Sequence, residues 1–454
     1  LRLNADYQTD SDLLWEVFSD DYRTEPQPTS FADLTWLGQR FAISGNVRPR
    51  LNYFETTVER LPELRLSAFQ QELGFGGLQY RSETTVADLR MHWRSYDLNR
   101  PGLTDPADYE ATRLDSAHTF YRPLTLGGWL RVVPRAGIRL THYTDSSDRA
   151  ITQDDLDNLF AIDDPRAIRG DARNARNYDD NGDARTRMAY ELGTELSFKS
   201  YRNWADAQSH FWDVDGLRHV VEPYVNYTYI PEPNVSKDHL YFFDGTDRLD
   251  EVNVIRIGAR QRFETRRADQ VYTFARIENY LDFHPNPENG QAKAGDFGTV
   301  LHLKPRTWLG FRAKALVDSD TMNLSVFSLA SRLGEEDGVN GEISYLFRDA
   351  HRARYVDSWG SELTSILDSQ AFGQSYSDTH ALGLTFTLPI NAITRLKTYH
   401  YFDLDRGVLG VQSYELQREL RCWVAALRLE ENNNSFGIFL MLYLKQFPGF
   451  KVGS

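Results

Sequence analysis

The chain is poor in cysteine, in methionine and in long apolar runs. It holds 1 Cys and 4 Met among 454 residues, so Cys422 can form a disulfide only with a partner outside the chain. Mean hydropathy is −0.54. No run approaches the roughly 18–20 apolar residues that a transmembrane helix needs. A helical membrane protein is therefore excluded, whereas a membrane barrel is not, because half of each barrel strand faces a polar interior.

Positive charge is also in deficit. The net charge is −14, which argues against a nucleic-acid partner held through phosphate contacts. No signal peptide opens the chain, because Leu1 already stands in a strand-like alternation. We therefore expect a mature fragment or an excised domain. Aromatic residues, in contrast, are plentiful, with 24 Tyr and 26 Phe, as in β-proteins that carry interfacial aromatic girdles.

Alternation at period two is the dominant pattern, and it places one set of side chains on each face of a strand. The segment 188–199 is the clearest case. Its apolar set is Met188, Tyr190, Leu192, Leu196 and Phe198, and its other set is Ala189, Glu191, Gly193, Glu195, Ser197 and Lys199. Segments 255–263 and 309–317 repeat the theme. The apolar face of the expected last strand consists of Ile438, Leu440, Leu442 and Leu444.

The alternating segments run about 9–12 residues, which is what a tilted strand needs to cross a bilayer, whereas soluble strands more often stop near 5–6. The pattern predicts an all-β fold: one large antiparallel transmembrane β-barrel of roughly 20–26 strands that occupies residues 1–454, with no linker to a second domain. Short links such as 305–307 alternate with long polar loops, among them the acidic loop 144–186. A soluble sandwich is the alternative, and it would bury the apolar face in a core.

Catalytic and metal-binding motifs are not found. None of the 11 His residues accompanies a nucleophile motif, so we assign no catalytic residue and no enzyme activity. The acidic run 179–183 lacks the spacing of a calcium loop, so we assign no metal and no cofactor.

Charged residues mark the expected lumen. The candidate lumen-facing set is Arg256, Arg260, Arg262, Glu191, Glu195 and Lys199. These cations either balance the carboxylates of a water-filled interior or contact phosphorylated cargo, and both interpretations stay open at this point.

Several stretches, in order along the chain, resemble the LptD family of lipopolysaccharide-assembly proteins. They are Tyr7 to Asp21, Arg60 to Leu66, Arg218 to Pro231, Phe243 to Asn253, Tyr414 to Leu429 and Phe436 to Leu440. Each motif is weak alone, and their common order makes the set specific. The chain departs from the family at Arg421-Cys422, where the family often has two adjacent cysteines.

The resemblance implies a structural transporter in the Gram-negative outer membrane. Lipopolysaccharide would be inserted into the outer leaflet through the lumen and a lateral seam between the first and last strands, here Ile438 to Leu444. A lipoprotein plug of the LptE type and a periplasmic jellyroll domain, which this chain lacks, would be its partners together with membrane lipid. Cys422 would form a disulfide to that domain. The resemblance leaves open whether the first barrel strands are present.

Two other functions remain open at this point. A general or substrate-specific porin would share the barrel and would conduct ions steadily. A barrel-embedded hydrolase would depend on a His, Ser and Asp set.

Overall fold

The computed structural model describes most of the chain. The described residues are 1–5, 7, 29–53, 57–74, 76–92, 108–147, 182–267, 270–286, 293–319, 321–335, 338–349, 379–432, 435–445 and 447–453. Most of the acidic loop predicted at 144–186, namely residues 148–181, lies outside them. The same holds for the start of the family resemblance, residues 8–21.

The described chain consists almost entirely of strands. The first are β1 (Arg2–Asn4), β2 (Phe31–Leu37), β3 (Phe41–Arg48), β4 (Thr57–Glu72), β5 (Gln79–His92), β6 (Tyr109–Tyr121), β7 (Leu124–Leu126) and β8 (Leu130–Tyr143). Next come β9 (Arg185–Phe198), β10 (Ser200–Ser209), β11 (Val214–Ile230), β12 (Val252–Arg267), β13 (Gln270–Phe283), β14 (Ala294–Arg306), β15 (Leu309–Val317) and β16 (Leu324–Gly334). The last are β17 (Asn340–Arg348), β18 (Thr379–Asn391), β19 (Thr394–Asp403), β20 (Val408–Leu420), β21 (Trp423–Asn432), β22 (Ser435–Leu444) and β23 (Phe447–Gly453).

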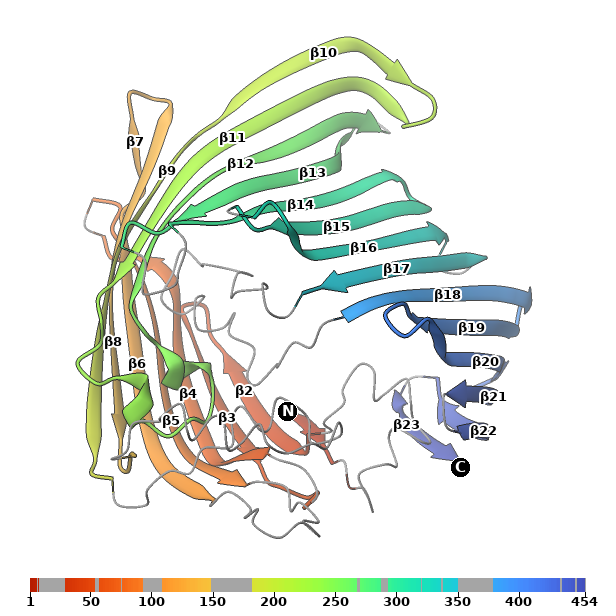
Figure 1. The fold of residues 1–454 in the computed structure, drawn as a ribbon, viewed down its shortest axis with the longest axis horizontal. Coiled ribbons are helices and arrows are strands. Elements are labelled where there is room, and N and C mark those ends of the chain that lie inside the picture. The colour runs from red at the N-terminus through yellow and green to blue at the C-terminus, as the bar shows by residue number, and fades with distance from the viewer. Residues whose placement is uncertain are drawn as a thin grey trace.

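All 23 strands belong to one antiparallel sheet in which sequence neighbours pair (Figure 1). Two strands are interrupted: β6 and β7 pair with successive parts of β8, and β9 and β10 pair with successive parts of β11. The prediction of one large antiparallel sheet of about 20–26 strands is confirmed. The sheet curves strongly, and within the described residues no ladder joins β1 to β23.

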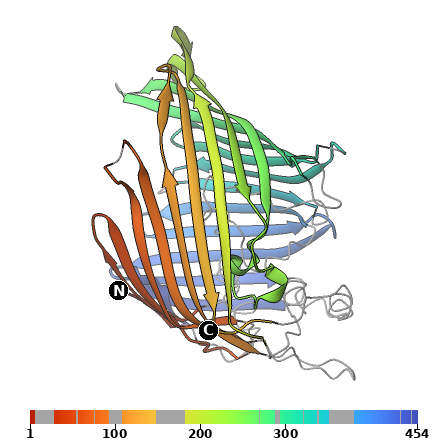
Figure 2. The same cartoon turned by 90° about the vertical axis from the view of Figure 1, so that its left-hand side faces the viewer.

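Connections alternate in length along the sheet. Tight turns such as 307–308 between β14 and β15 lie at one edge, and long connections such as 231–251 between β11 and β12 lie at the other. Figure 2 shows the early strands (red to yellow) side by side between these two edges. This alternation is typical of bacterial outer-membrane barrels, whose short turns are periplasmic and whose long loops are extracellular.

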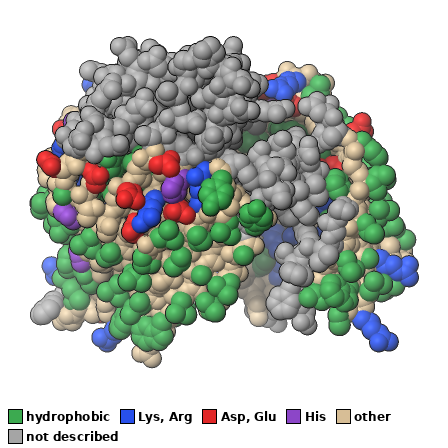
Figure 3. Space-filling model, turned by 90° about the horizontal axis from the view of Figure 1, so that it is seen from below, with side chains coloured by type: hydrophobic (Ala, Val, Ile, Leu, Met, Phe, Trp, Pro, Cys, Tyr) green, Lys and Arg blue, Asp and Glu red, His purple; other side chains and the backbone are tan. Residues whose placement is uncertain are grey.

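The two faces of the sheet differ in chemistry, as the alternation predicts. In β9, Tyr190 and Leu192 are 46% and 56% exposed, whereas Glu191 between them is fully buried. Farther along, a row of directly paired leucines crosses β18 to β22 on the exposed face: Leu388, Leu396, Leu416, Leu427 and Leu440. Hydrophobic side chains spread over the strand surface in Figure 3. An exposed apolar surface of this extent requires lipid or another apolar partner.

One strand prediction is wrong in position. The strand with Ile438, Leu440, Leu442 and Leu444 is β22, which is not the last, because β23 pairs with its end from Met441 to Leu444. Strand β23 contains Pro448 and two glycines, which are depleted in strands and hide it from pattern analysis.

Helical structure within the described residues is limited to two short 3₁₀ turns. Neither is long or apolar enough to cross a membrane.

Candidate functional site

The connection between β11 and β12 folds back onto one face of the sheet, which is here called the inner face. Its central part, residues 237–249, here called the inner segment, contains the 3₁₀ helices η1 (Lys237–His239) and η2 (Gly245–Arg248). In Figure 1 the inner segment (green) lies within the curve of the sheet against its early strands. A long polar loop of a barrel has no intrinsic reason to adopt this position, so specific contacts must hold it there.

Aromatic packing is the first of these contacts. Leu240, Tyr241, Phe242 and Phe243 are each at most 2% exposed. The three aromatic side chains pack against Ala87, Leu89 and Met91 of β5 and Tyr109 and Ala111 of β6. The Tyr109 ring stacks on Tyr241 at 4.8 Å between centroids, and its hydroxyl donates to the Phe242 carbonyl at 2.6 Å. Burial of several aromatic side chains stabilises the docked position by roughly 1.5–3 kcal/mol each.

A capping box shapes the turn that follows these aromatics. Asp244 caps η2 and accepts from the Thr246 amide at 2.9 Å. Asp247 in turn accepts from the amides of Phe243 and Asp244 at 2.7 and 2.9 Å. The exchange satisfies the amides at the start of the turn and brings two carboxylates close together. Two adjacent carboxylates out of bulk water need a cation.

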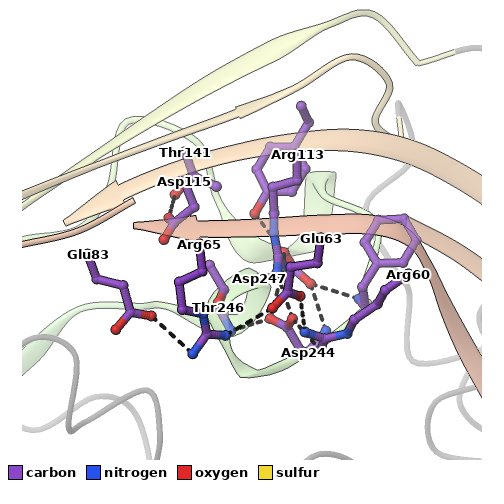
Figure 4. Close-up of polar contacts among 12 residues, drawn as sticks. Arg60, Glu63, Arg65, Glu83, Arg113, Asp115, Thr141, Asp244, Thr246 and Asp247 are labelled. Carbon is purple, nitrogen blue, oxygen red and sulfur yellow. Dashed lines mark hydrogen bonds and ion pairs between the residues drawn. The ribbon is translucent and has the colours of Figure 1, made fainter. Parts of the chain in front are cut away.

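Arg113 of β6 supplies that cation. Its side chain is 4% exposed, and its guanidinium donates to Asp244 at 2.9 and 2.6 Å and to Asp247 at 2.7 Å (Figure 4). Arg60 of β4 adds a longer contact to Asp244 at 3.3 Å. Burial alone would raise the pKa of Asp244, but the attraction and hydrogen bonding of Arg113, assisted by Arg60, lower it well below the ordinary value. The docked segment therefore carries Asp244 as a carboxylate.

Three further side chains of the inner face complete the anchor. Tyr143 of β8 donates to Asp247 at 2.7 Å. Arg187 of β9 donates to the backbone carbonyls of Thr246 and Asp247 at 2.6 and 3.0 Å. Arg139, held in a bidentate pair with Asp115 at 2.8 Å, donates to the Thr246 hydroxyl at 3.2 Å. Strands β4, β6, β8 and β9 thus all contribute to one polar cluster around η2.

Acid should weaken this anchor. The pKa of Asp244 is lower in the docked state than the 3.8 of an ordinary aspartate, so its contribution is complete above that pH and is lost as the pH falls towards the docked pKa. We expect hydrogen-exchange protection of residues 240–249 to be constant from about pH 8 to 5 and to fall below about pH 4. The variant Asp244→Asn should be less protected at neutral pH, with a flatter acid limb. An equally steep limb in that variant would assign the acid response to another group.

Sequence-predicted charges on β9 and β12 lie on the same inner face. Glu191 accepts from Arg135 at 2.7 Å, and Arg135 also reaches Asn226 at 2.9 Å. Arg256 forms a bidentate pair with Asp282 at 2.7 and 2.8 Å. These contacts satisfy buried charges within the wall, because an unpaired buried charge would cost several kcal/mol.

The other predicted charges are held less tightly. Arg260 lies among carboxylates at 3.4 Å from Glu195 and 3.4 Å from Glu278. Arg262 is 3.8 Å from Glu264, and Lys199 is 3.6 Å from Glu222 and more than half exposed. The cations of these pairs are 41% to 57% exposed, so solvent screens them and each pair contributes at most about 1 kcal/mol.

The inner segment is the feature that sequence reasoning missed. Residues 243–253 resemble a motif of the family, but that motif does not predict where they lie relative to the sheet. The signal was present in the four apolar residues 240–243, an unusual run for a solvated loop, followed by aspartates three residues apart. The partner Arg113 carried no local signal, because it is one of several arginines that alternate with apolar residues.

Cys422 lies in the tight turn between β20 and β21, with its thiol free and exposed. The position leaves it accessible to a partner.

A curved antiparallel sheet with an apolar outer face, a charged inner face, and short and long connections at opposite edges is the architecture of an outer-membrane β-barrel. The chain belongs to the LptD family, described as LPS transport system D, whose family model matches residues 2–390. It is thus a multi-pass β-barrel region of the outer membrane, from a family of lipopolysaccharide transport.

Solved structures similar to the chain include a siderophore receptor, a ferric enterobactin receptor and the FpvAI–pyocin S2 complex. The receptor PirA from Acinetobacter baumannii has 8% identity and a TM-score of 0.39, over 92% of this chain and 66% of that one. FpvAI, in its complex with pyocin S2, has 10% identity and a TM-score of 0.34, over 91% and 62%. A variant of the ferric enterobactin receptor PfeA from Pseudomonas aeruginosa has 8% identity and a TM-score of 0.39, over 91% and 70%. The chain thus spans about two thirds of the length of these three chains. No curated protein matches the chain.

Proposed function

We propose that this chain forms the passage through which lipopolysaccharide is inserted into the outer leaflet of the outer membrane. The two-faced wall is the observation that supports the proposal. Its inner face is lined by charged groups suited to a phosphorylated sugar head, and its outer face is lined by exposed leucines suited to acyl chains. A glycolipid has both parts, and the wall offers one surface suited to each. Residues 1–454 act as one barrel domain in this proposal, without covalent chemistry.

The proposed exit is a lateral seam at the ends of the sheet. Strand β23 pairs only with Met441 to Leu444 of β22 among the described residues. The part of β22 that holds Ile438 and Leu440 therefore lacks a described partner on that side. Unpaired strand edges are tolerated in a membrane only briefly or when covered, so a short terminal ladder suits a seam that opens and closes.

The partners in this proposal are lipopolysaccharide, an LptE-like plug lipoprotein, and a periplasmic domain with the Lpt bridge components beyond it. Exposed Cys422 is accessible for a disulfide to that domain. A Cys422-dependent shift of the full-length protein on a non-reducing gel is the expected sign of this bond, and its absence would remove the disulfide from the proposal.

Conductance separates this function from that of a porin. We expect full-length protein in planar bilayers, purified with its small lipoprotein, to conduct little, and to conduct more once that lipoprotein is removed. A porin would conduct steadily as purified. In parallel, labelled lipopolysaccharide should reach the outer leaflet of vesicles that carry the complex. Steady conductance without this transfer would favour the porin.

A further inference from the structure

The strongest unassigned feature of the inner face is a row of three arginines and one histidine that crosses four adjacent strands. Strand register pairs Arg262 of β12 with Arg276 of β13, Arg276 with His302 of β14, and His302 with Arg312 of β15. Directly paired residues project from the same face of a sheet. We call these four residues the cationic row.

The row lies on the inner face. Leu316 of β15 and Val300 of β14 pack in a cluster with buried Tyr280. His302 is two residues from Val300, and Arg312 is four residues from Leu316, so the side chains of the row project from the same face as this cluster. Phe297 of β14 is five residues from His302 and projects from the opposite, outer face, where it is 45% exposed. Arg262 is six residues from Arg256 in β12, so the two side chains project from the same face. Arg256 pairs with Asp282 on the inner face.

Like charges directly opposite one another destabilise a strand pair. Elsewhere on this face the arginines meet carboxylates, as Arg113, Arg135 and Arg256 do. Within the described residues, Arg262 of the row lies 3.8 Å from Glu264, whereas the side chains of Arg276 and Arg312 form no ion pair or hydrogen bond, and both are exposed. Arg262 and Arg276 therefore repel each other across the β12–β13 pair, and an anion bound across the row would offset that repulsion.

A cavity of about 1110 Å³ lies over the row. Six cations line it, adding Arg260, Lys304 and Arg332 to the three arginines of the row, against three carboxylates, Glu278, Glu335 and Glu342. It extends to Thr307 and Trp308 in a tight turn, so it lies in the half of the wall nearer the short turns. The inner segment docks at the opposite, long-loop half. The row and the inner segment are thus separate sites.

We infer that the cationic row binds the phosphorylated sugar head of a glycolipid. Planar guanidinium groups match phosphate oxygens in bidentate geometry. Three interstrand spacings of about 4.8 Å give the row a length of about 14 Å, so it can engage phosphates on separate sugars, whereas one free phosphate would bridge a single pair. The inference rests on the proposed function, and short turns on the periplasmic side would place the row where cargo enters.

The test compares binding of two ligands to purified full-length protein in lipid nanodiscs. One is fluorescent lipopolysaccharide with its phosphates, and the other is the same material after phosphate removal. We expect Arg276→Gln with Arg312→Gln to weaken binding of the phosphorylated ligand at least about tenfold, because charge-assisted bonds are lost. Binding of the dephosphorylated ligand should be equal in both proteins. The control, Arg131→Gln with Arg421→Gln, removes the same charge from exposed positions outside the cavity and should bind as the parent does.

Stability distinguishes lost binding from lost folding. Since the variant relieves like-charge repulsion, it should unfold at the same or a higher temperature than the parent without ligand. A lower unfolding temperature would contradict the repulsion argument. If neither phosphate removal nor the double variant changes affinity more than about twofold, the inference fails while lipopolysaccharide binding, and with it the proposed function, stands.

Other outcomes overturn the inference in different ways. If the parent binds neither ligand, the proposed function and the inference both fail. If inorganic phosphate at the same concentration as the glycolipid displaced it from the protein, the row would be a site for free phosphate. Loss of the co-purified lipoprotein from the double variant, with unchanged glycolipid binding, would assign it to a protein contact.

Discussion

Replacing Arg113 with alanine should release the inner segment from the wall. The substitution leaves Asp244 and Asp247, which share this guanidinium at 2.6–2.9 Å, without their main cation. Removal of one partner from a buried pair costs about 3–5 kcal/mol, far more than an exposed pair is worth. We expect amides of residues 240–249 to lose hydrogen-exchange protection and the segment to become sensitive to protease, while the strands stay protected.

The matched control is Arg122→Ala, because Arg122 lies just past the end of β6 and is exposed. Its replacement should leave the segment protected. The substitution Arg113→Lys keeps the charge but loses the planar fork, so it should give an intermediate loss of protection. Full protection of residues 240–249 in Arg113→Ala would mean that the aromatic cluster alone holds the segment, and the ionic anchor would be redundant.

The second large effect concerns the outer face. Phe386 and Thr385 are sequence neighbours in β18 on opposite faces: Phe386 is 43% exposed on the apolar face, and Thr385 pairs with Glu342 on the inner face. An arginine at the lipid-facing middle of a barrel strand costs about 2–4 kcal/mol. We therefore expect Phe386→Arg to lower the free energy of unfolding in lipid vesicles by that amount, and Thr385→Arg, which faces a carboxylate, to leave it nearly unchanged.

Urea titration of both variants in vesicles measures the difference directly. Equal losses in the two variants would show that the faces are not lipid and water, and the membrane assignment of this strand would be wrong. Leu427→Arg on β21, within the row of paired leucines, offers an independent repeat of the lipid-facing case.

The sequence predicted the fold well because alternation is a local property. A strand with lipid on one side and water on the other must alternate, so segments such as 188–199 reveal their two faces without knowledge of neighbours. Strand β23 was not predicted, because Pro448 and two glycines give its segment a low strand propensity. Its pairing with β22 stabilises it as a strand. Interruptions such as the one between β9 and β10 were also invisible, since the pattern continues across them.

The sites were predictable only in part. The alternation along a single strand predicts which face a charged residue such as Glu191 or Arg256 projects from. Which charges meet depends on register between strands, and this separates the satisfied pair of Arg256 with Asp282 from the like-charged pair of Arg262 with Arg276. The anchor of the inner segment depends on a contact between positions 131 residues apart. No periodicity within either stretch encodes such a contact.

The separation along the chain has a consequence for how the protein reaches its native state. Nearly every strand pairs with its predecessor, so hairpins can form in sequence order with small loop-closure entropy. The inner segment is different, because Asp244 meets Arg60 and Arg113, which precede it by 184 and 131 residues. Docking must wait until the intervening hairpins have curved into a wall. Its attachment therefore reports that the first half of the sheet has been correctly assembled.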